Sequence, residues 1–165
     1  MGPANISLAG KVVFLLILAN GTPVVGKKIL GDKLDIPIDG GLMWSDGQPL
    51  FGKAKTVRGV TLALIVTAGL APIVDIQFAH GALISAAAMV GDLFSSFLKR
   101  RLKIPVSGMS IGLDQIPEAL LPALVAKCVL PLTSLDVGGI VLAFFLVDLV
   151  FSRTFFMLKI RDRPY

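Results

Sequence analysis

The sequence predicts an all-α integral membrane protein with about five transmembrane helices, forming one polytopic domain over residues 1–165. Hydrophobic residues make up 55% of the chain and charged residues only 16%, against about 25% charged residues in soluble domains. The apolar residues gather in five segments near the length of about 20 residues that a bilayer requires. A chain of this size cannot bury so much apolar surface in its own core, so a bilayer is the expected solvent.

The apolar segments are separated by connections of two kinds. A short Asp75–His80 connection and a turn at Thr133–Gly139 join neighbouring segments. Two longer polar stretches, 27–56 and 99–114, are expected to be structured loops, and Gly, Pro and Asp in the first favour a short strand pair or a helix. The expected spans are 5–26, 57–75, 78–98, 115–134 and 138–158.

The basic residues predict the orientation, because cytoplasmic loops of membrane proteins carry an excess of Lys and Arg. They gather in 27–58, in 99–103 and at the C-terminal end, which five spans place on one side. We therefore expect a cytoplasmic C-terminus and an N-terminus outside. The net charge of +5 then reflects membrane orientation and attraction to anionic lipid headgroups, rather than binding to nucleic acid.

The third apolar segment carries Asp92, Ser95, Ser96 and Lys99 at positions i, i+3, i+4 and i+7 of one helix face. A carboxylate inside a span is costly and usually faces a cavity or a partner. A functional site and a structural ion pair both explain Asp92. Arg101 and Lys103 are expected to serve mainly orientation.

A second acidic pair, Asp114 and Glu118, begins the fourth segment at i, i+4 spacing. Helix capping by Asp114 is the structural alternative. Asp92 and Asp114 nevertheless lie at similar depth on consecutive antiparallel spans, and two carboxylates suit Mg²⁺ bound together with phosphates.

The start of the second segment adds basic residues, Lys55 and Arg58. Thr56 between them can contact a phosphate, and Gly52 and Gly59 would let backbone approach a ligand closely. Basic residues at a cytoplasmic helix end are nevertheless common in membrane proteins.

Other polar residues, in the spans and in the first loop, have structural explanations first. Asn20 interrupts the first span, where either a kink or a polar group reaching the site is possible. Asp39 lies in an Asp-Gly-Gly turn sequence. Lys127 and Asp148 are expected to form a structural ion pair with each other.

The segment "GDLFSSFLKRRLKIPVSGMSIGLD" resembles the signature of the membrane-bound CTP:phosphatidate cytidylyltransferases. "FGKAKTVRG" resembles the upstream stretch of that family through Lys55, Thr56 and Gly59, with Arg58 in place of an acidic residue. The residues of the first segment that match are Gly91-Asp92-Leu93, Ser96, Lys99-Arg100, Ser107-Gly108 and Asp114.

The chain departs from the bacterial pattern, and the departures fit an archaeal branch. Pro105-Val106 replaces a Lys-Asp pair, a His-Gly-Gly segment is missing, and Gln115 replaces an Arg. "LANGTPVV" and "PIDGGLMWSDGQPLFGKAKTVRG" resemble regions of the CDP-archaeol synthases, so the resemblance covers nearly the whole chain.

This resemblance implies transfer of CMP from CTP to 2,3-bis-O-geranylgeranylglycerol 1-phosphate at the cytoplasmic face of the cell membrane. It implies Asp92, Asp114 and Lys99 as catalytic residues, with Mg²⁺ as cofactor on the two aspartates. The implied partners are CTP, an isoprenoid ether lipid phosphate and the bilayer. The implied nucleotide- or phosphate-binding residues are Lys55, Thr56, Arg58, Gly59, Ser96, Arg100, Asn20, Asp39 and Gly52.

Other functions remain as alternatives at this point. A phosphatidate cytidylyltransferase of broader lipid specificity would share the same chemistry. A small transporter would need polar residues through the full depth of the bundle, whereas the charges here crowd one surface. A CDP-alcohol phosphotransferase would continue its D-G motif differently from "DGQPLF".

Overall fold

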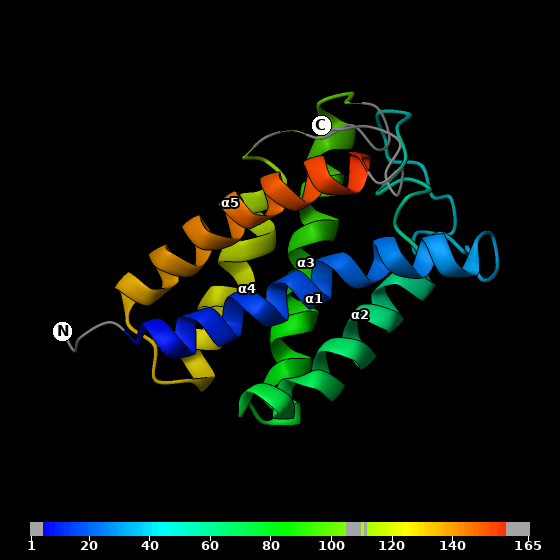
Figure 1. The fold of residues 1–165 in the computed structure, drawn as a ribbon. Coiled ribbons are helices and arrows are strands. Elements are labelled where there is room, and N and C mark those ends of the chain that lie inside the picture. Colours follow the sequence, from blue (N-terminus) through cyan, green and yellow to red (C-terminus); the bar gives the residue numbers. More distant parts are fainter. Residues whose placement is uncertain (1–4, 105–109, 111, 158–165) are drawn as a thin grey trace.

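In a computed structural model, the described residues 5–104, 110 and 112–157 contain five α-helices, one short 3₁₀ helix and no extended strand (Figure 1). The all-α prediction is confirmed. Ser107-Gly108, Pro105-Val106 and the C-terminal Lys159, Arg161 and Arg163 lie outside the described residues. The elements are α1 (Ile6–Leu30), α2 (Val57–Leu70), η1 (Ala71–Val74), α3 (Phe78–Arg101), α4 (Gln115–Val129) and α5 (Ser134–Met157).

Four helical segments are long and apolar enough to cross a membrane within the described part of the chain: α1, α2 continued by η1, α3 and α5. The fifth, α4, has 15 residues and a length of about 22 Å, which is shorter than a bilayer core of about 30 Å. It packs antiparallel against the part of α5 between Ser134 and Asp148. Gln115 at its start donates to Asp148 at 2.9 Å, and Lys127 near its end donates to Ser134 at 2.8 Å.

These two contacts show that the predicted ion pair between Lys127 and Asp148 is wrong. The two side chains contact opposite ends of the antiparallel α4–α5 pair. Lys127 lies near the chain reversal that joins α4 to α5, whereas Asp148 lies 14 residues beyond Ser134, so the two side chains are at different depths.

The helix boundaries correct three predicted limits. α1 continues to Leu30, so the polar loop begins at Gly31. α4 ends at Val129, because Leu130 precedes Pro131 and is extended. α5 already begins at Ser134, so the predicted turn at Thr133–Gly139 is wrong and the chain reverses over 130–133.

A capping box sets the start of α5. The Thr133 N–H donates to Asp136 Oδ2 at 2.7 Å, and the Asp136 N–H donates to Thr133 Oγ1 at 3.2 Å. Asp136 Oδ1 also accepts from the Asn5 N–H at 2.8 Å, which ties α1 to α5. Lys11 and Asp75 form a 2.9 Å ion pair at the same end of the bundle.

The opposite end of the bundle carries the loop between α1 and α2, which lies beside the end of α3 (Figure 1). Antiparallel bridges pair Pro37 with Thr56 and Met43 with Pro49. The expected strand pair therefore exists only as isolated bridges, and residues 31–56, all of them described, contain no helix.

A glycine lets α3 and α4 pack in close contact. A Cβ at Gly91 would lie 2.7 Å from the Pro117 carbonyl carbon and 3.0 Å from Glu118 Cα. Real Cβ atoms essentially never approach backbone so closely, so α4 can take this position only because residue 91 has no side chain. This contact sets the first turn of α4 against Asp92.

We expect Gly91→Ala to lower the melting temperature in detergent by several degrees, because the added methyl group overpacks the helix contact at a cost of about 1–3 kcal/mol. Size-exclusion chromatography after heating measures this. Gly138→Ala is the matched control, since Gly138 is helical and a methyl group there would have nothing within 4 Å. Equal melting temperatures for the two variants would contradict the close contact.

Candidate functional site

Two ion pairs bring the loop, α3 and the start of α4 together. Lys55 Nζ pairs with Asp92 Oδ1, and Lys99 Nζ lies 2.7 Å from Asp114 Oδ1. Lys99 also interacts electrostatically with Asp92, and Asp114 with Lys55, so the pairs are neighbours. We call Lys55, Asp92, Lys99, Asp114 and Glu118 the charged cluster. The structure thus confirms that the two predicted aspartates approach the same group of basic residues.

The members of the charged cluster come from α3, from the start of α4 and from the loop. Asp92 and Lys99 lie on one face of α3, about 10 Å apart along its axis. Asp114 immediately precedes α4. Lys55 arrives from the loop, whose Ile38 N–H donates to the Lys55 carbonyl at 2.8 Å.

Glu118 belongs to this cluster, although the sequence did not place it among the metal or catalytic residues. Its carboxyl group lies next to that of Asp92, and the Ser95 hydroxyl lies 3.5 Å from Glu118 Oε1. The i, i+4 spacing from Asp114 was visible in the sequence, but the contact with Asp92 depends on the close packing at Gly91. The cluster therefore holds three carboxyl groups and two ammonium groups.

Lys55 stays protonated throughout the physiological range. Burial alone would lower the pKa of Lys55, but the negative charges of Asp92 and Glu118 and the hydrogen bond to Asp92 outweigh it and raise the pKa above its ordinary value. A permanent cation thus lies next to the carboxylates on α3 and α4.

Asp39 organises the loop from inside. Its carboxylate accepts from the backbone N–H groups of Gly41, Phe51 and Gly52 at 3.0, 2.9 and 3.1 Å. Burial would raise the pKa of Asp39, but these three hydrogen bonds stabilise the carboxylate and lower it below the ordinary value. The structure gives Asp39 and Gly52 a role in holding the loop, and direct nucleotide contact by either stays a prediction.

Arg58 and Thr56 also hold local structure. The buried Arg58 guanidinium donates to the carbonyl oxygens of Gly31, at 2.8 Å, and Lys33, and it pairs with Asp35 at 2.9 Å. Thr56 Oγ1 caps α2 by accepting from the Gly59 N–H at 3.1 Å. The guanidinium thus faces the loop rather than the charged cluster, and its predicted phosphate contact stays a prediction.

The remaining predicted residues are packed within the bundle. Asn20 donates to the Leu16 carbonyl of its own helix at 3.0 Å, and α1 runs on without interruption. A Cβ at Gly59 would lie 3.3 Å from Pro23 Cβ, so Gly59 is a contact point between α2 and α1. Ser96 and Arg100 are buried, and Arg100 interacts electrostatically with Asp114.

Arg101 is the clearest departure from expectation. Its side chain pairs with Asp46 at 3.0 Å and donates to the Pro49 carbonyl at 2.7 Å. The guanidinium thus binds the loop, which the sequence did not indicate, and the predicted role of its charge in orientation stays a prediction.

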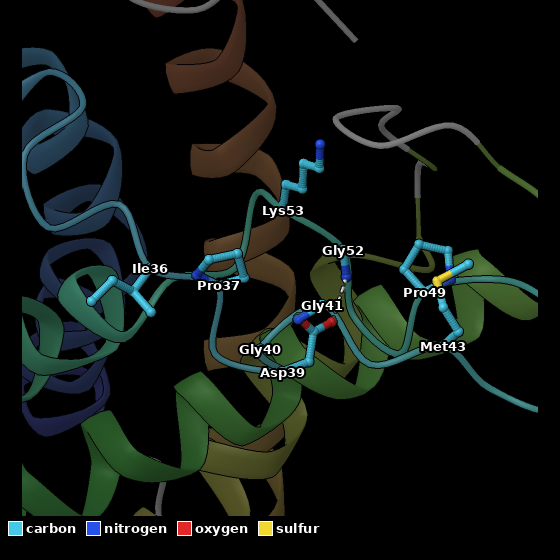
Figure 2. Close-up of a pocket in the computed structure, with 9 residues that line it drawn as sticks. All are labelled: Ile36, Pro37, Asp39, Gly40, Gly41, Met43, Pro49, Gly52 and Lys53. Carbon is cyan, nitrogen blue, oxygen red and sulfur yellow. Dashed lines mark hydrogen bonds between the residues drawn. The ribbon is translucent and has the colours of Figure 1, made fainter.

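A pocket of about 320 Å³ lies within the loop (Figure 2). Figure 2 shows the Asp39 carboxylate directed toward Gly41 and Gly52, and the Lys53 side chain pointing outward. Lys53 is two residues from Lys55 in the chain, and no member of the charged cluster lines the pocket. The lining residues are Ile36, Pro37, Asp39, Gly40, Gly41, Met43, Pro49, Gly52 and Lys53.

The donors of the charged cluster fit a divalent cation that arrives with phosphates better than a preformed metal site. Among the described residues, no three His, Cys, Asp or Glu side chains are arranged to hold a metal ion by themselves. Mg²⁺ commonly uses only one or two carboxylates together with phosphate oxygens and waters. Asp92 and Asp114 would supply two such oxygen ligands, beside the ammonium groups of Lys55 and Lys99 that suit phosphates.

Comparison with known proteins places this chain in a family. The profile of the family described as "CarS-like: CDP-archaeol synthase" matches residues 71–165. CDP-archaeol synthase of Pyrococcus furiosus is 38% identical over 107 residues, covering 59% of this chain and 60% of that protein. The protein of the same name from Pyrobaculum islandicum is 36% identical over 112 residues, covering 62% of this chain and 66% of that protein. The chain thus matches somewhat less than two thirds of the length of these relatives.

A solved structure supports the same grouping over more of the chain. It is described as "Structural insight into an intramembrane enzyme for archaeal membrane lipids biosynthesis", with a TM-score of 0.68 and 25% identity. The match covers 82% of this chain and 89% of that one. With the shared helical fold and a family profile that matches more than half of its residues, this chain belongs to the CarS-like family of CDP-archaeol synthases.

Proposed function

We propose that this protein transfers CMP from CTP to the phosphate of 2,3-bis-O-geranylgeranylglycerol 1-phosphate, forming the CDP-activated ether lipid and pyrophosphate. The observation that carries the proposal is the charged cluster, which lies where the polar loop meets the membrane helices. Membership of the family and the name that its relatives carry support the choice of substrate class.

The chemistry requires positioning of anions more than proton removal. A phosphate oxygen of the lipid attacks the α-phosphorus of CTP, and the bond to the oxygen bridging the α- and β-phosphorus breaks as pyrophosphate leaves. Because the nucleophile is already an anion, no strong base is needed. The protein must instead bring two anions together and stabilise the charge on the leaving group.

The charged cluster supplies the groups for this task. Asp92 and Asp114 would hold Mg²⁺, which when bound neutralises charge on the phosphate oxygens. Lys55 and Lys99, which here pair with those carboxylates, would turn to the phosphates of CTP and of the lipid. Arg100, next to Asp114, adds a further positive charge.

The proposed topology has five spans, with the charged cluster at the cytoplasmic face. Lys27, Lys28 and Lys33 lie at the end of α1 or in the loop that follows it, and Lys99, Arg100 and Arg101 end α3. The opposite end carries Asp75 and Asp136, with Lys11 paired to Asp75. The positive-inside rule therefore favours a cytoplasmic cluster and an N-terminus outside.

Cysteine labelling tests this orientation. In a Cys128→Ser background, Gln77→Cys lies between η1 and α3 and Lys33→Cys lies in the α1–α2 loop, both at exposed positions. We expect a membrane-impermeant maleimide to label residue 77 on intact cells and residue 33 only after permeabilisation. The reverse pattern would contradict the orientation, and labelling of both on intact cells would contradict the assignment of spans.

A radiolabelled CTP assay with purified protein tests the reaction itself. We expect CTP- and Mg²⁺-dependent formation of a CDP-lipid with the geranylgeranyl ether substrate. The apolar tails are bound loosely, since each methylene changes binding by only about 1 kcal/mol, so some change in the tails should be tolerated. A higher kcat/KM for diacyl phosphatidic acid would favour a phosphatidate cytidylyltransferase instead.

Asparagine substitutions test the two aspartates. We expect Asp92→Asn and Asp114→Asn each to lower kcat by about 100-fold or more, since each removes a charged ligand of the Mg²⁺ that would neutralise the reacting phosphates. Size-exclusion profiles in detergent should stay unchanged. Asp75→Asn is the control, because Asp75 lies at the opposite end of the bundle. Near-normal turnover in either aspartate variant would remove that residue from the site.

A further inference from the structure

Arg101, the last residue of α3, gathers a set of contacts from a single turn of the loop. Its Nε lies 3.0 Å from Asp46 Oδ2, and its Nη2 donates to the carbonyl oxygens of Pro49 and Gln48 at 2.7 and 3.4 Å. A planar guanidinium can reach a carboxylate and carbonyl groups at once, which a lysine ammonium cannot do with the same geometry.

Two aromatic rings complete the contact. The Arg101 guanidinium carbon lies 4.8 Å from the centre of the Phe97 ring and 5.7 Å from the Trp44 ring. Trp44 and Phe97 meet edge to face with their centres 5.5 Å apart. Phe97 and Arg101 both belong to the last turns of α3. Trp44 of the loop packs on these two side chains.

The segment held in this way is a small hairpin over residues 42–50. Met43 and Pro49 are joined by a β-bridge, and the Trp44 N–H donates to the Gln48 carbonyl at 2.8 Å. Met43 and Pro49 also line the loop pocket. The position of one wall of the pocket therefore depends on where the hairpin docks.

The same helix end carries the charged cluster. Lys99, two residues before Arg101, pairs with Asp114. Arg101 thus joins the pocket wall to the helix turn that holds Lys99.

We propose that Arg101 is a positioning residue, which fixes the 42–50 hairpin on α3 and so sets the distance between the loop pocket and the charged cluster. This inference rests on the proposed function, because it takes CTP as the substrate, and it adds that the loop pocket binds part of the nucleotide whose phosphates reach the charged cluster. The guanidinium of Arg101 makes polar contacts with the hairpin residues Asp46, Gln48 and Pro49.

The consequence is a specific kinetic signature. A freed hairpin leaves the charged cluster assembled but lets the pocket wall move, so nucleotide binding weakens more than the chemical step. We expect Arg101→Ala to raise the KM for CTP about tenfold while kcat changes by less than about threefold. Arg101→Lys keeps the positive charge but loses the planar guanidinium that contacts the hairpin and stacks on Phe97 and Trp44. It should therefore restore only part of the affinity for CTP.

Trp44 gives a readout that does not require activity, because it is the one tryptophan of the sequence. It is 49% exposed when docked. In Arg101→Ala and in Phe97→Leu, acrylamide should quench its fluorescence more strongly and the emission should shift to longer wavelength. Phe97→Leu keeps a helix-forming residue while removing the ring that both Trp44 and Arg101 contact.

Lys103→Ala is the matched control, since it removes a basic residue two positions further along without touching the hairpin contacts. Its Trp44 quenching and its KM for CTP should match those of the unmodified protein. If Lys103→Ala and Arg101→Ala behave alike, a diffuse basic surface explains the effect and the inference is overturned.

The two proposals fail in different ways. Unchanged Trp44 quenching in Arg101→Ala would overturn the docking role whether or not CMP transfer occurs. Altered quenching with unchanged KM and unchanged CTP affinity would overturn the link between hairpin and pocket. Absence of transfer by the unmodified protein with every lipid would instead contradict the proposed function, and binding of CTP to purified protein by calorimetry would then measure the affinities.

Discussion

The structure depends on keeping opposite charges together inside an apolar bundle. A carboxylate such as Asp92 is costly in a membrane helix unless a cation accompanies it. Lys55 supplies that cation from the loop, and Lys99 does the same for Asp114. The loop must therefore fold back over the helix ends, and α4 must start beside α3. Asp39 and Arg58 bind backbone groups of the loop and so fix the conformation of the segment before Lys55. This conformation is what lets Lys55 reach Asp92.

The residues that match the motifs of the family have two different roles in this structure. Lys55, Asp92 and Lys99 carry charge into the cluster. Thr56 and Gly59 shape the chain around it, through a helix cap and a close helix contact. Loss of activity after substitution at one of the second group would therefore not identify a ligand. Measurements of folding alongside turnover separate the two groups.

The sequence predicted the membrane class and the approach of Asp92 and Asp114, because hydropathy and helical spacing are local properties. It placed the start of α5 four residues too late, because the residue types of the Thr133–Asp136 capping box also suit a turn. It could not predict the partners of Arg101, since the hairpin that binds this side chain lies more than 50 residues earlier in the chain. The contact of Glu118 with Asp92 was hidden for a similar reason, because it arises from a glycine on the facing helix.

The shortness of α4 has a consequence for the surrounding lipid. Its 15 residues begin next to the charged cluster, and Ile116, Leu120 and Leu124 on its surface are exposed. A hydrophobic segment shorter than the bilayer core is accommodated by local thinning of the bilayer or by tilting of neighbouring segments. With α4 as a span, hydrophobic mismatch would draw the headgroup layer inward beside this helix. A lipid phosphate could then reach the depth of Asp92 while its own tails stay in hydrocarbon. Local thinning of the bilayer would in this way help to bring the lipid substrate to the charged cluster.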